Sequence, residues 1–123
     1  SLKYSKEREE FGKPISSFQA ISFKLADMAT ELQAADLLVM HAAHKADQSR
    51  MTPTDAAMCK LYASEMLQRL ADHAVQIFGG MGLMEELPIE RLWRDSRLER
   101  IWDGTSEIQR HIISRELLRP LGG

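Results

Sequence analysis

The clearest pattern along the chain is a run of apolar residues spaced alternately four and three positions apart between residues 17 and 49. This spacing places the side chains on one face of a helix, and that face needs a neighbouring helix to cover it. We therefore expect a long helix over 17–49, with Leu32 buried in its apolar stripe. The stripe comprises Ile21, Leu25, Met28, Leu32, Ala35, Val39, Ala42 and Ala46.

A second long helix is expected after Thr52 and Pro53, because threonine is favoured at an N-cap and proline at the first helical position. Apolar residues at helical spacing then continue from Met58 to Ile77, and Gly79-Gly80 ends the pattern. The short connection between the two periodic segments predicts an antiparallel pair of helices.

The rest of the chain predicts shorter helices and no sheet. Gly12 and Pro14 mark a turn before the first long helix, and Pro88 can open a helix that reaches about Glu99. A final helix is expected over about 106–118. No stretch alternates apolar and polar residues as a half-buried strand does. The sequence therefore predicts an all-α, up-and-down bundle of about four helices, two of them long.

Composition limits the kinds of function that the chain can have. The chain has 123 residues and forms one domain at most, over 1–123. Of its residues 44% are apolar, which is enough for a hydrophobic core. A net charge of −2 is no electrostatic footprint for nucleic acid. No apolar run is long enough to span a membrane, and no secretory signal is visible. The single Cys59 cannot form an internal disulfide.

The stretch from residue 99 to residue 110 carries the strongest hint of chemistry. Asp103 follows an aromatic residue and precedes Gly104, whose missing Cβ allows a close approach to the backbone. Thr105 or Ser106 can cap the following helix, and Ser106 with Gln109 has the spacing of a capping box. Asp103 is then either a plain turn residue or a carboxylate that faces a ligand.

Two other segments allow a structural and a functional interpretation. Gly79-Gly80-Met81-Gly82 follows a helix rather than a strand, which rejects a dinucleotide-binding fold; it is either a glycine C-cap or a place where a ligand presses on bare backbone. Arg8 lies in a charge-dense run, where it either pairs with Glu7 or Glu9 or binds a ligand. His41 and His44 stand three apart without a third ligand nearby, so we expect no metal site.

Three motifs together resemble the carboxy-terminal domain of the acyl-CoA dehydrogenases. They are Arg8-Glu-Glu-Phe-Gly-Lys-Pro-Ile15 followed by Phe18-Gln19, then Gln76-Ile-Phe-Gly-Gly-Met-Gly82, and then residues 99–110, in the family's order and at about its spacing. The resemblance runs from about Tyr4 to the end of the chain. It implies a helical bundle whose first long helix precedes Arg8, so that this chain is a fragment lacking most of that helix.

The resemblance implies that the chain contributes to FAD sites shared between subunits. The arginine of the family contacts the flavin pyrophosphate of a neighbouring subunit, and the glycine segment faces the adenosine half of FAD from another subunit. The matching flavin-binding positions here are Arg8, Phe11, Phe18, Gln19, Gln76, Ile77, Gly79, Gly80, Thr105 and Glu107, and Gly104 matches a position that leaves room for the substrate thioester.

Asp103 matches the catalytic base of the family. The resemblance implies that this carboxylate removes the α-proton of an acyl-CoA while the β-hydride leaves to flavin, and that its backbone N–H polarises the thioester carbonyl. Most of the family has Glu here, and Asp is one methylene shorter. Either the backbone shifts, or the substrate sits deeper, or the base lies on the missing first helix, as in the isovaleryl and long-chain branches, or the protein is a nitroalkane-oxidase-like enzyme with an aspartate base.

The resemblance further implies a homotetramer of a bacterial cytoplasm or a mitochondrial matrix, active in fatty acid metabolism with electron-transfer flavoprotein as the electron acceptor. This region alone is expected to be inactive, because the family's middle strand domain holds most of the flavin pocket. A non-catalytic helical oligomerisation module is the rival interpretation. Arg8, Gln76 and the carboxylate at position 103 argue against it.

Overall fold

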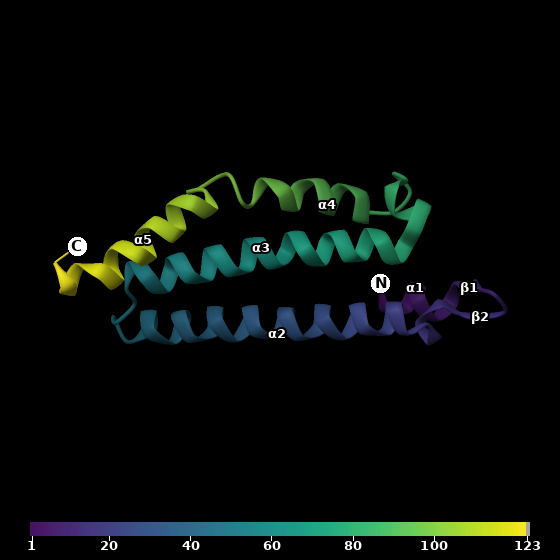
Figure 1. The fold of residues 1–123 in the computed structure, drawn as a ribbon, viewed down its shortest axis with the longest axis horizontal. Helices are drawn as coiled ribbons and strands as arrows, with labels where there is room; N and C mark the ends of the chain where they lie inside the picture. Colours follow the sequence, from purple (N-terminus) through teal and green to yellow (C-terminus); the bar gives the residue numbers. More distant parts are fainter. Residues whose placement is uncertain (123) are drawn as a thin grey trace.

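The computed structural model describes residues 1–122 and is built almost entirely of helices (Figure 1). The all-α fold predicted from the sequence is confirmed. The α-helices are α1 (Leu2–Glu7), α2 (Gln19–Asp47), α3 (Pro53–Phe78), α4 (Ile89–Leu98) and α5 (Ser106–Leu118), with short 3-10 turns η1 (Ile15–Ser17), η2 (Gly79–Leu83) and η3 (Arg119–Leu121).

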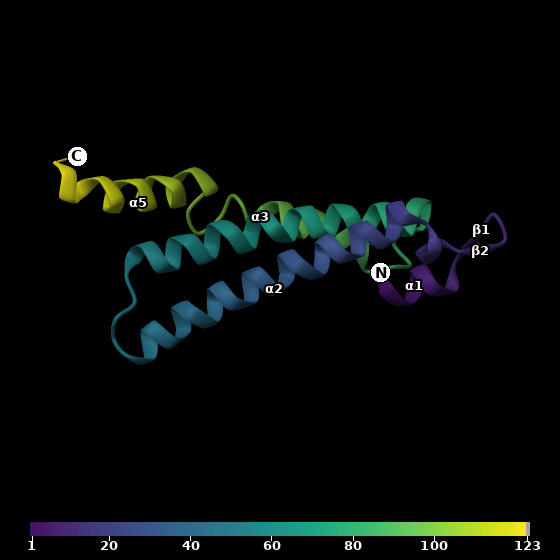
Figure 2. The ribbon, with the colours of Figure 1, turned by 60° about the horizontal axis from the view of Figure 1, so that its bottom comes forward.

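The long helices α2 and α3 form the expected antiparallel pair, and they cross at an angle (Figure 2). Helix α3 begins with the predicted cap. The Thr52 hydroxyl accepts from the backbone N–H of Asp55 at 3.3 Å, and the Asp55 carboxylate accepts from the backbone N–H of Thr52 at 2.8 Å. The same carboxylate pairs with the Lys45 ammonium at 2.6 Å, which ties the end of α2 to the start of α3. These contacts hold the Asp55 pKa below its usual range.

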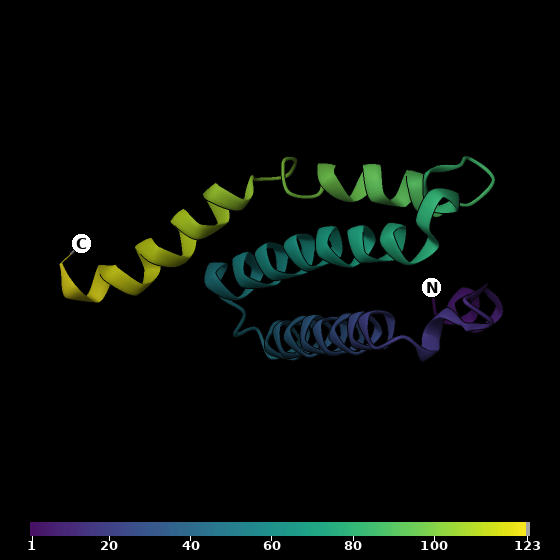
Figure 3. The same ribbon diagram turned by 45° about the vertical axis from the view of Figure 1, so that its right-hand side comes forward.

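Helices α4 and α5 follow one another along the other side of α3, so that three layers result (Figure 3). The Trp93 indole N–H donates to the Asp72 carboxylate at 3.2 Å and joins α4 to α3. Arg110 pairs with Glu65 at 2.7 Å and joins α5 to α3. Helix α3 is therefore the central element, because its side chains hold both α4 and α5 in place.

The interior of the chain is lined mainly by small residues, which allow the helices to approach closely. Large apolar side chains such as Phe23 and Leu37 remain exposed on α2. The accessible surface is 8500 Å², whereas a compact monomer of this mass exposes about 6,700 Å². The excess shows that the chain is less compact than such a monomer, and the exposed large side chains show that part of this surface is apolar. The buried small residues include Ala35, Ala42, Ala57, Ala71 and Ala74, together with Ser5, Ser64, Ser96 and Ser106.

The expected burial of Leu32 is wrong for this chain, because 56% of this residue is exposed. The face of α2 that meets α3 instead includes Ala35, Ala42 and the half-buried Glu31. Glu31 pairs with Arg69 of α3 at 2.6 Å. Leu32 lies one residue away along a helix that carries apolar residues on more than one side. The sequence pattern therefore marked a broader apolar surface than the one α3 covers.

The prediction of no sheet is also wrong, because a small antiparallel hairpin precedes α2. Strand β1 (Glu9–Glu10) pairs with β2 (Lys13–Pro14). Phe11 and Gly12 form the two-residue loop with φ angles of 54° and 77°, as in a type I′ hairpin turn. Strands of two residues are too short to show an alternation of apolar and polar residues. The turn residues are therefore the only sequence signal for this hairpin. No helix within residues 1–122 has the length and apolar character needed to cross a membrane.

Candidate functional site

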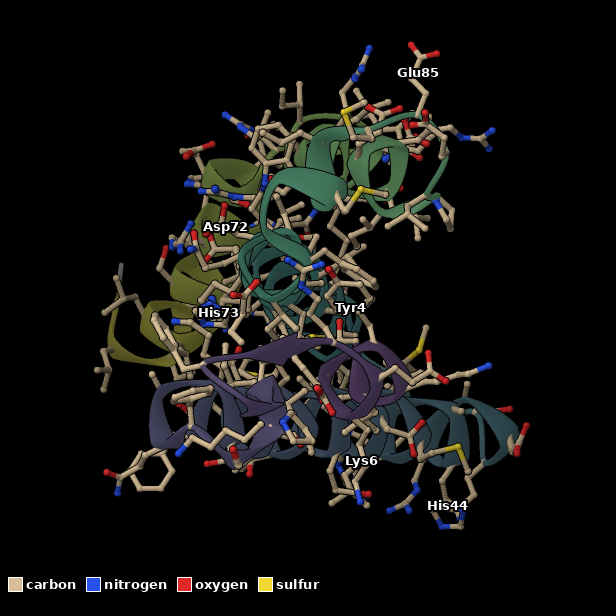
Figure 4. All side chains as sticks on the ribbon, turned by 90° about the vertical axis from the view of Figure 1, so that its right-hand side faces the viewer. Tyr4, Lys6, His44, Asp72, His73 and Glu85 are labelled. Carbon is tan, nitrogen blue, oxygen red and sulfur yellow. The ribbon has the colours of Figure 1, made fainter. Side chains whose placement is uncertain are left out.

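The first of two candidate regions is a groove between the hairpin and the end of α3. It has a volume of about 800 Å³, and it is mainly apolar. Tyr4 of α1, labelled in Figure 4, closes one side. Its hydroxyl donates to the Phe78 carbonyl at 3.4 Å, and the two rings are tilted by 42° with 4.5 Å between their centroids. Six of the predicted flavin-binding residues line this groove: Arg8, Phe11, Phe18, Ile77, Gly79 and Gly80.

Arg8 supplies the positive charge of this groove. Its guanidinium donates to one carboxylate oxygen of Glu10 through Nε at 3.2 Å and Nη2 at 2.6 Å. That hydrogen bond and the charge of Glu10 raise the already high pKa of Arg8. The sequence predicted a partner at Glu7 or Glu9, but the hairpin brings Glu10 next to Arg8 instead. Both side chains remain exposed, so the fork is accessible from outside.

The glycines at the end of α3 differ in what surrounds them. A Cβ added to Gly79 or Gly80 would meet no heavy atom within 4 Å. A Cβ on Gly82 would lie 2.7 Å from the Val75 carbonyl, so Gly82 is needed for packing. Bare, open backbone at 79 and 80 is therefore the part of this motif that can admit a ligand.

The other predicted residues of this region lie in different environments. Phe11 is 93% exposed at the hairpin tip and meets Phe18 edge to face, with 6.2 Å between ring centroids. Ile77 is only 3% exposed and packs in the interior, so the groove reaches little of it. Gln19 and Gln76 are exposed but do not line the groove.

The second region is the turn between α4 and α5, which contains Asp103. Asp103 and Gly104 adopt φ angles of 51° and 93°, and the Asp103 side chain is exposed. Positive φ is costly for a residue other than glycine, and such strain is often found at functional sites. The turn thus exposes the Asp103 carboxylate to solvent. The backbone conformation of Asp103 is unfavourable, so the surrounding structure must stabilise it.

The predicted capping box of Ser106 with Gln109 is wrong, and Thr105 is the N-cap of α5. The Thr105 hydroxyl accepts from the backbone N–H of Ile108 at 3.3 Å. Ser106 is buried, and its backbone N–H donates back to the Arg100 carbonyl at 3.1 Å. The Gln109 side chain folds under the turn, where its amide donates to the Gly104 carbonyl at 3.2 Å.

Gly104 is required by contacts within the chain. A Cβ at this position would stand 2.6 Å from the Gln109 amide nitrogen, and its φ of 93° disfavours any L side chain. On that side the space beside Gly104 is filled by Gln109.

Lys60 of α3 is a residue of this region that the sequence reasoning missed. Its ammonium donates to the carbonyls of Glu99 at 2.7 Å, Trp102 at 3.0 Å and Gly104 at 2.7 Å. The signal was present, since Lys60 lies at helical spacing from Ala57 and Ser64, which are both buried. A lysine on the buried side of a helix needs acceptors there, but the sequence does not say which ones.

Carboxylates around the turn are kept ionised by their neighbours. Burial opposes the charge of Glu65, but the hydrogen bond and charge of Arg110, with Arg100 at 4.0 Å, outweigh it and lower the Glu65 pKa. The pKa of Glu107, in the first turn of α5, is lowered by its own backbone N–H and by the Thr105 hydroxyl. Within residues 1–122, no three His, Cys, Asp or Glu side chains stand together as a metal site would require.

The two regions are well separated on α3. Lys60 contacts the α4–α5 turn, whereas Phe78 lines the groove. At 1.5 Å of rise per residue, the stretch of α3 between these residues is about 27 Å long. The structure therefore brings most of the sequence-predicted residues together as two groups, one at each region, and leaves Gln19 and Gln76 outside the groove.

Comparison with known proteins gives a consistent result. The family model described as "Acyl-CoA dehydrogenase, C-terminal domain" matches residues 1–118. The protein YngJ of Bacillus subtilis, named a probable acyl-CoA dehydrogenase, is 54% identical over 97% of this chain and 31% of its own length. Subunit CarC of the caffeyl-CoA reductase–Etf complex of Acetobacterium woodii is 48% identical over the same shares.

A solved structure titled "FAD complex of PigA" matches with a TM-score of 0.92 and 38% identity, over 99% of this chain and 31% of that one. The chain thus spans about a third of the length of the relatives that it matches. The match to the family model, over nearly the whole chain, shows that it belongs to the acyl-CoA dehydrogenase family and corresponds to the C-terminal domain.

Proposed function

We propose that this chain is the C-terminal domain, over 1–123, of a flavin-dependent dehydrogenase that introduces an α,β double bond into an acyl-CoA thioester. The observation that carries the proposal is the α4–α5 turn, where the chain holds the exposed Asp103 carboxylate on a positive-φ backbone between two helices. The family match supports the reaction class, and the resemblance of residues 99–110 to the family's motif supports Asp103 as the base.

The groove residues fit one part of FAD, which is an elongated ligand with planar rings and an anionic centre. Gly79 and Gly80 leave open space for a close approach, Phe11 and Phe18 offer aromatic surface, and Arg8 offers a forked cation suited to phosphate oxygens. We assign the pyrophosphate to Arg8 and the adenosine half to the segment from Gln76 to Gly80, including Ile77. Gln19 is assigned to the same cofactor, because it follows Phe18 directly. When bound, FAD supplies the acceptor for the β-hydride.

Thr105 and Glu107 would contact flavin from the second region, beside the reacting thioester. The separation of about 27 Å along α3 supports an assembly in which the two regions of one chain serve flavins in different subunits. The uncovered apolar faces support the same assembly, a homotetramer of full-length chains.

In this reaction Asp103 takes the α-proton onto a carboxylate oxygen, and the electron pair left on Cα forms the new double bond as the β-hydride departs. The backbone N–H of Asp103 donates to the thioester carbonyl and stabilises the charge that develops on its oxygen. We place the thioester beside Gly104, on the side that Gln109 leaves open.

The remaining assignments concern partners and setting. Electron-transfer flavoprotein is the proposed acceptor of the electrons, which is supported by the relative that is a subunit of an Etf complex. The proposed setting is fatty acid metabolism in a bacterial cytoplasm or a mitochondrial matrix. Without the rest of the protein, this region is expected neither to hold FAD tightly nor to catalyse the reaction.

The test is the Asp103→Asn variant of the full-length, flavin-loaded protein. Bleaching of the flavin by acyl-CoA is followed by stopped flow, and removal of a general base is expected to slow it by about 10²–10⁴-fold. Acyl-CoA binding should be largely retained, because the backbone N–H remains, and Asp103→Glu should keep measurable activity. Asp95→Asn is the matched control, since Asp95 is an exposed carboxylate of α4 outside the turn.

Near-normal flavin reduction in Asp103→Asn would place the base outside this chain's turn. Bleaching of the wild-type protein by nitroalkanes but by no acyl-CoA would favour a nitroalkane-oxidase-like enzyme. A full-length protein that takes up no flavin would favour the non-catalytic oligomerisation module.

A further inference from the structure

The ammonium of Lys60 stands at the centre of the α4–α5 turn. Lys60 lies near the start of α3 and is half-buried, and its Nζ donates to three backbone carbonyls that follow it by 39 to 44 residues. An ammonium has three N–H groups and no acceptor. Each N–H of the ammonium therefore donates to one carbonyl, and all three donors are bound by the turn.

The three carbonyls enclose Asp103 from both sides in the sequence. Glu99 is the C-cap of α4, where unpaired carbonyls carry partial negative charge that a cation stabilises. Trp102 precedes Asp103, and Gly104 follows it. Lys60 thus holds the peptide group that precedes Asp103, whose φ of 51° is unfavourable, and the peptide group that follows Gly104.

A second donor acts from the opposite direction. The buried Gln109 amide donates to the same Gly104 carbonyl at 3.2 Å that Lys60 holds at 2.7 Å. The Gly104 peptide is therefore fixed between α3 and α5. Because the backbone on both sides of Asp103 is held, the direction in which its carboxylate leaves the turn is held as well.

We propose that Lys60 is a positioning residue for Asp103: its ammonium clamps the three carbonyls around the turn and thereby sets where the carboxylate and the Asp103 N–H lie relative to the substrate. The catalytic half of this proposal rests on the proposed function, whereas the clamp itself does not. A displacement of about 1 Å at a reacting group can cost on the order of 10²-fold in rate. The clamp is thus expected to affect chemistry more than binding.

The test compares Lys60→Met with Lys45→Met in the full-length, flavin-loaded protein. Both variants remove one ammonium from a turn next to α3, but Lys45 holds Asp55 at the α2–α3 connection, far along the chain from Asp103. The first readout is the limiting rate of flavin reduction at saturating acyl-CoA, with the apparent Kd from the same titration. The second is amide hydrogen exchange of the segment 99–106 before substrate is added.

In Lys60→Met we expect the limiting rate to fall about 10–100-fold while the apparent Kd changes less than about threefold. Loss of charge-assisted hydrogen bonds should accelerate exchange in 99–106 about tenfold or more, because the turn opens more easily. Lys45→Met should leave both readouts within about threefold of wild type. A slower rate and faster exchange in Lys60→Met alone support the clamp, since a general effect of removing an ammonium would change the readouts of both variants.

If amide hydrogen exchange in 99–106 is unchanged in Lys60→Met, the clamp is overturned, whatever the rate in Asp103→Asn. Faster exchange with a normal rate, in an enzyme that needs Asp103, overturns positioning and leaves the proposed function intact. Faster exchange with normal rates of flavin reduction in both Lys60→Met and Asp103→Asn removes Asp103 from the role of base and overturns positioning with it, while the clamp on the backbone stands. Should Lys60→Met fail to fold, Lys60→Gln decides. Its amide is uncharged, one bond shorter than the lysine side chain, and has two N–H donors for three carbonyls. Losses in both readouts are therefore expected, and wild-type values in both overturn the proposal.

Discussion

The α4–α5 turn and the groove at the end of α3 both contain glycines and charged residues. Only in the turn is the glycine enclosed by other side chains of the same chain. In the turn, Gly104 faces the side chain of Gln109, and the carbonyls around Asp103 meet Lys60. In the groove, a Cβ on Gly79 or Gly80 would meet nothing, and Phe11 projects almost wholly into solvent. The turn is held by contacts within the chain, whereas the groove leaves bare glycine backbone and an aromatic ring uncovered.

This difference suits the two tasks that we propose. A catalytic base needs a fixed position, because rate depends steeply on the geometry of the reacting groups. A surface that binds the flavin of a neighbouring subunit needs access and complementary chemistry, and it gains order from the complex. The comparison predicts that substitutions in the turn change stability or rate, whereas those in the groove change affinity.

The largest effect of this comparison is expected from matched glycine substitutions. Gly104→Ala places a Cβ at a φ of 93° and 2.6 Å from the Gln109 amide, so we expect a loss of about 1–3 kcal/mol in the free energy of unfolding. Gly80→Ala meets open space without a positive φ, and its loss should stay below about 0.5 kcal/mol. Urea denaturation of the full-length protein measures both. Equal losses at the two positions would contradict the distinction between a completed turn and an open groove.

A smaller effect is expected in the groove from Arg8→Gln. Removing one charge-assisted contact to the pyrophosphate should weaken FAD binding about tenfold, measured by titrating the apo full-length protein with FAD. The unfolding free energy should hardly change, because the Arg8–Glu10 pair is exposed. Glu10→Gln is the control: it frees the Arg8 fork and should leave FAD affinity equal or higher. Unaltered FAD affinity in Arg8→Gln would remove Arg8 from the site.

The smallest effect concerns the pH dependence of the support beneath the turn. The pKa of Glu65 is lower in the folded chain than the usual 4.5, so its pairing with Arg110 stabilises the fold above that value and is lost as pH falls through the folded pKa. We expect the free energy of unfolding of wild type to exceed that of Glu65→Gln by about 0.5–1 kcal/mol at pH 7, and the gap to shrink as the pH falls below 4.5 and through the lowered pKa of Glu65. Urea midpoints at several pH values provide the measurement.

The control for this experiment is Asp95→Asn, which removes an exposed carboxylate paired with Arg91 within α4 itself. Such exposed pairs along one helix contribute little, about 0.3–0.5 kcal/mol. A gap between wild type and Glu65→Gln that widened as the pH fell would contradict the assigned direction of the Glu65 pKa.

The sequence by itself determined the features that depend on neighbouring residues. Thr52 and Pro53 predict the start of α3 because a cap and a fixed φ act within one helical turn. The glycines at 79 and 80 mark the end of α3, and residues 106–118 match α5. The break at Asp103-Gly104 was also visible, since glycine tolerates the positive φ that ends one helix and starts the next. The family motifs then marked three segments of the chain as candidates for site residues.

Only the tertiary structure decided which residues support those regions. Lys60 reaches carbonyls 39 to 44 residues later, and Gln109 turns under Gly104 instead of capping α5. Leu32 stays exposed because the rotation of α2 against α3 selects Ala35 and Ala42 for the contact. Periodicity places a residue on a face of its helix, but the neighbour that this face meets depends on how helices far apart in the sequence pack. Local torsions and caps are therefore encoded nearby, whereas the clamp around Asp103 exists only once α3, α4 and α5 have come together.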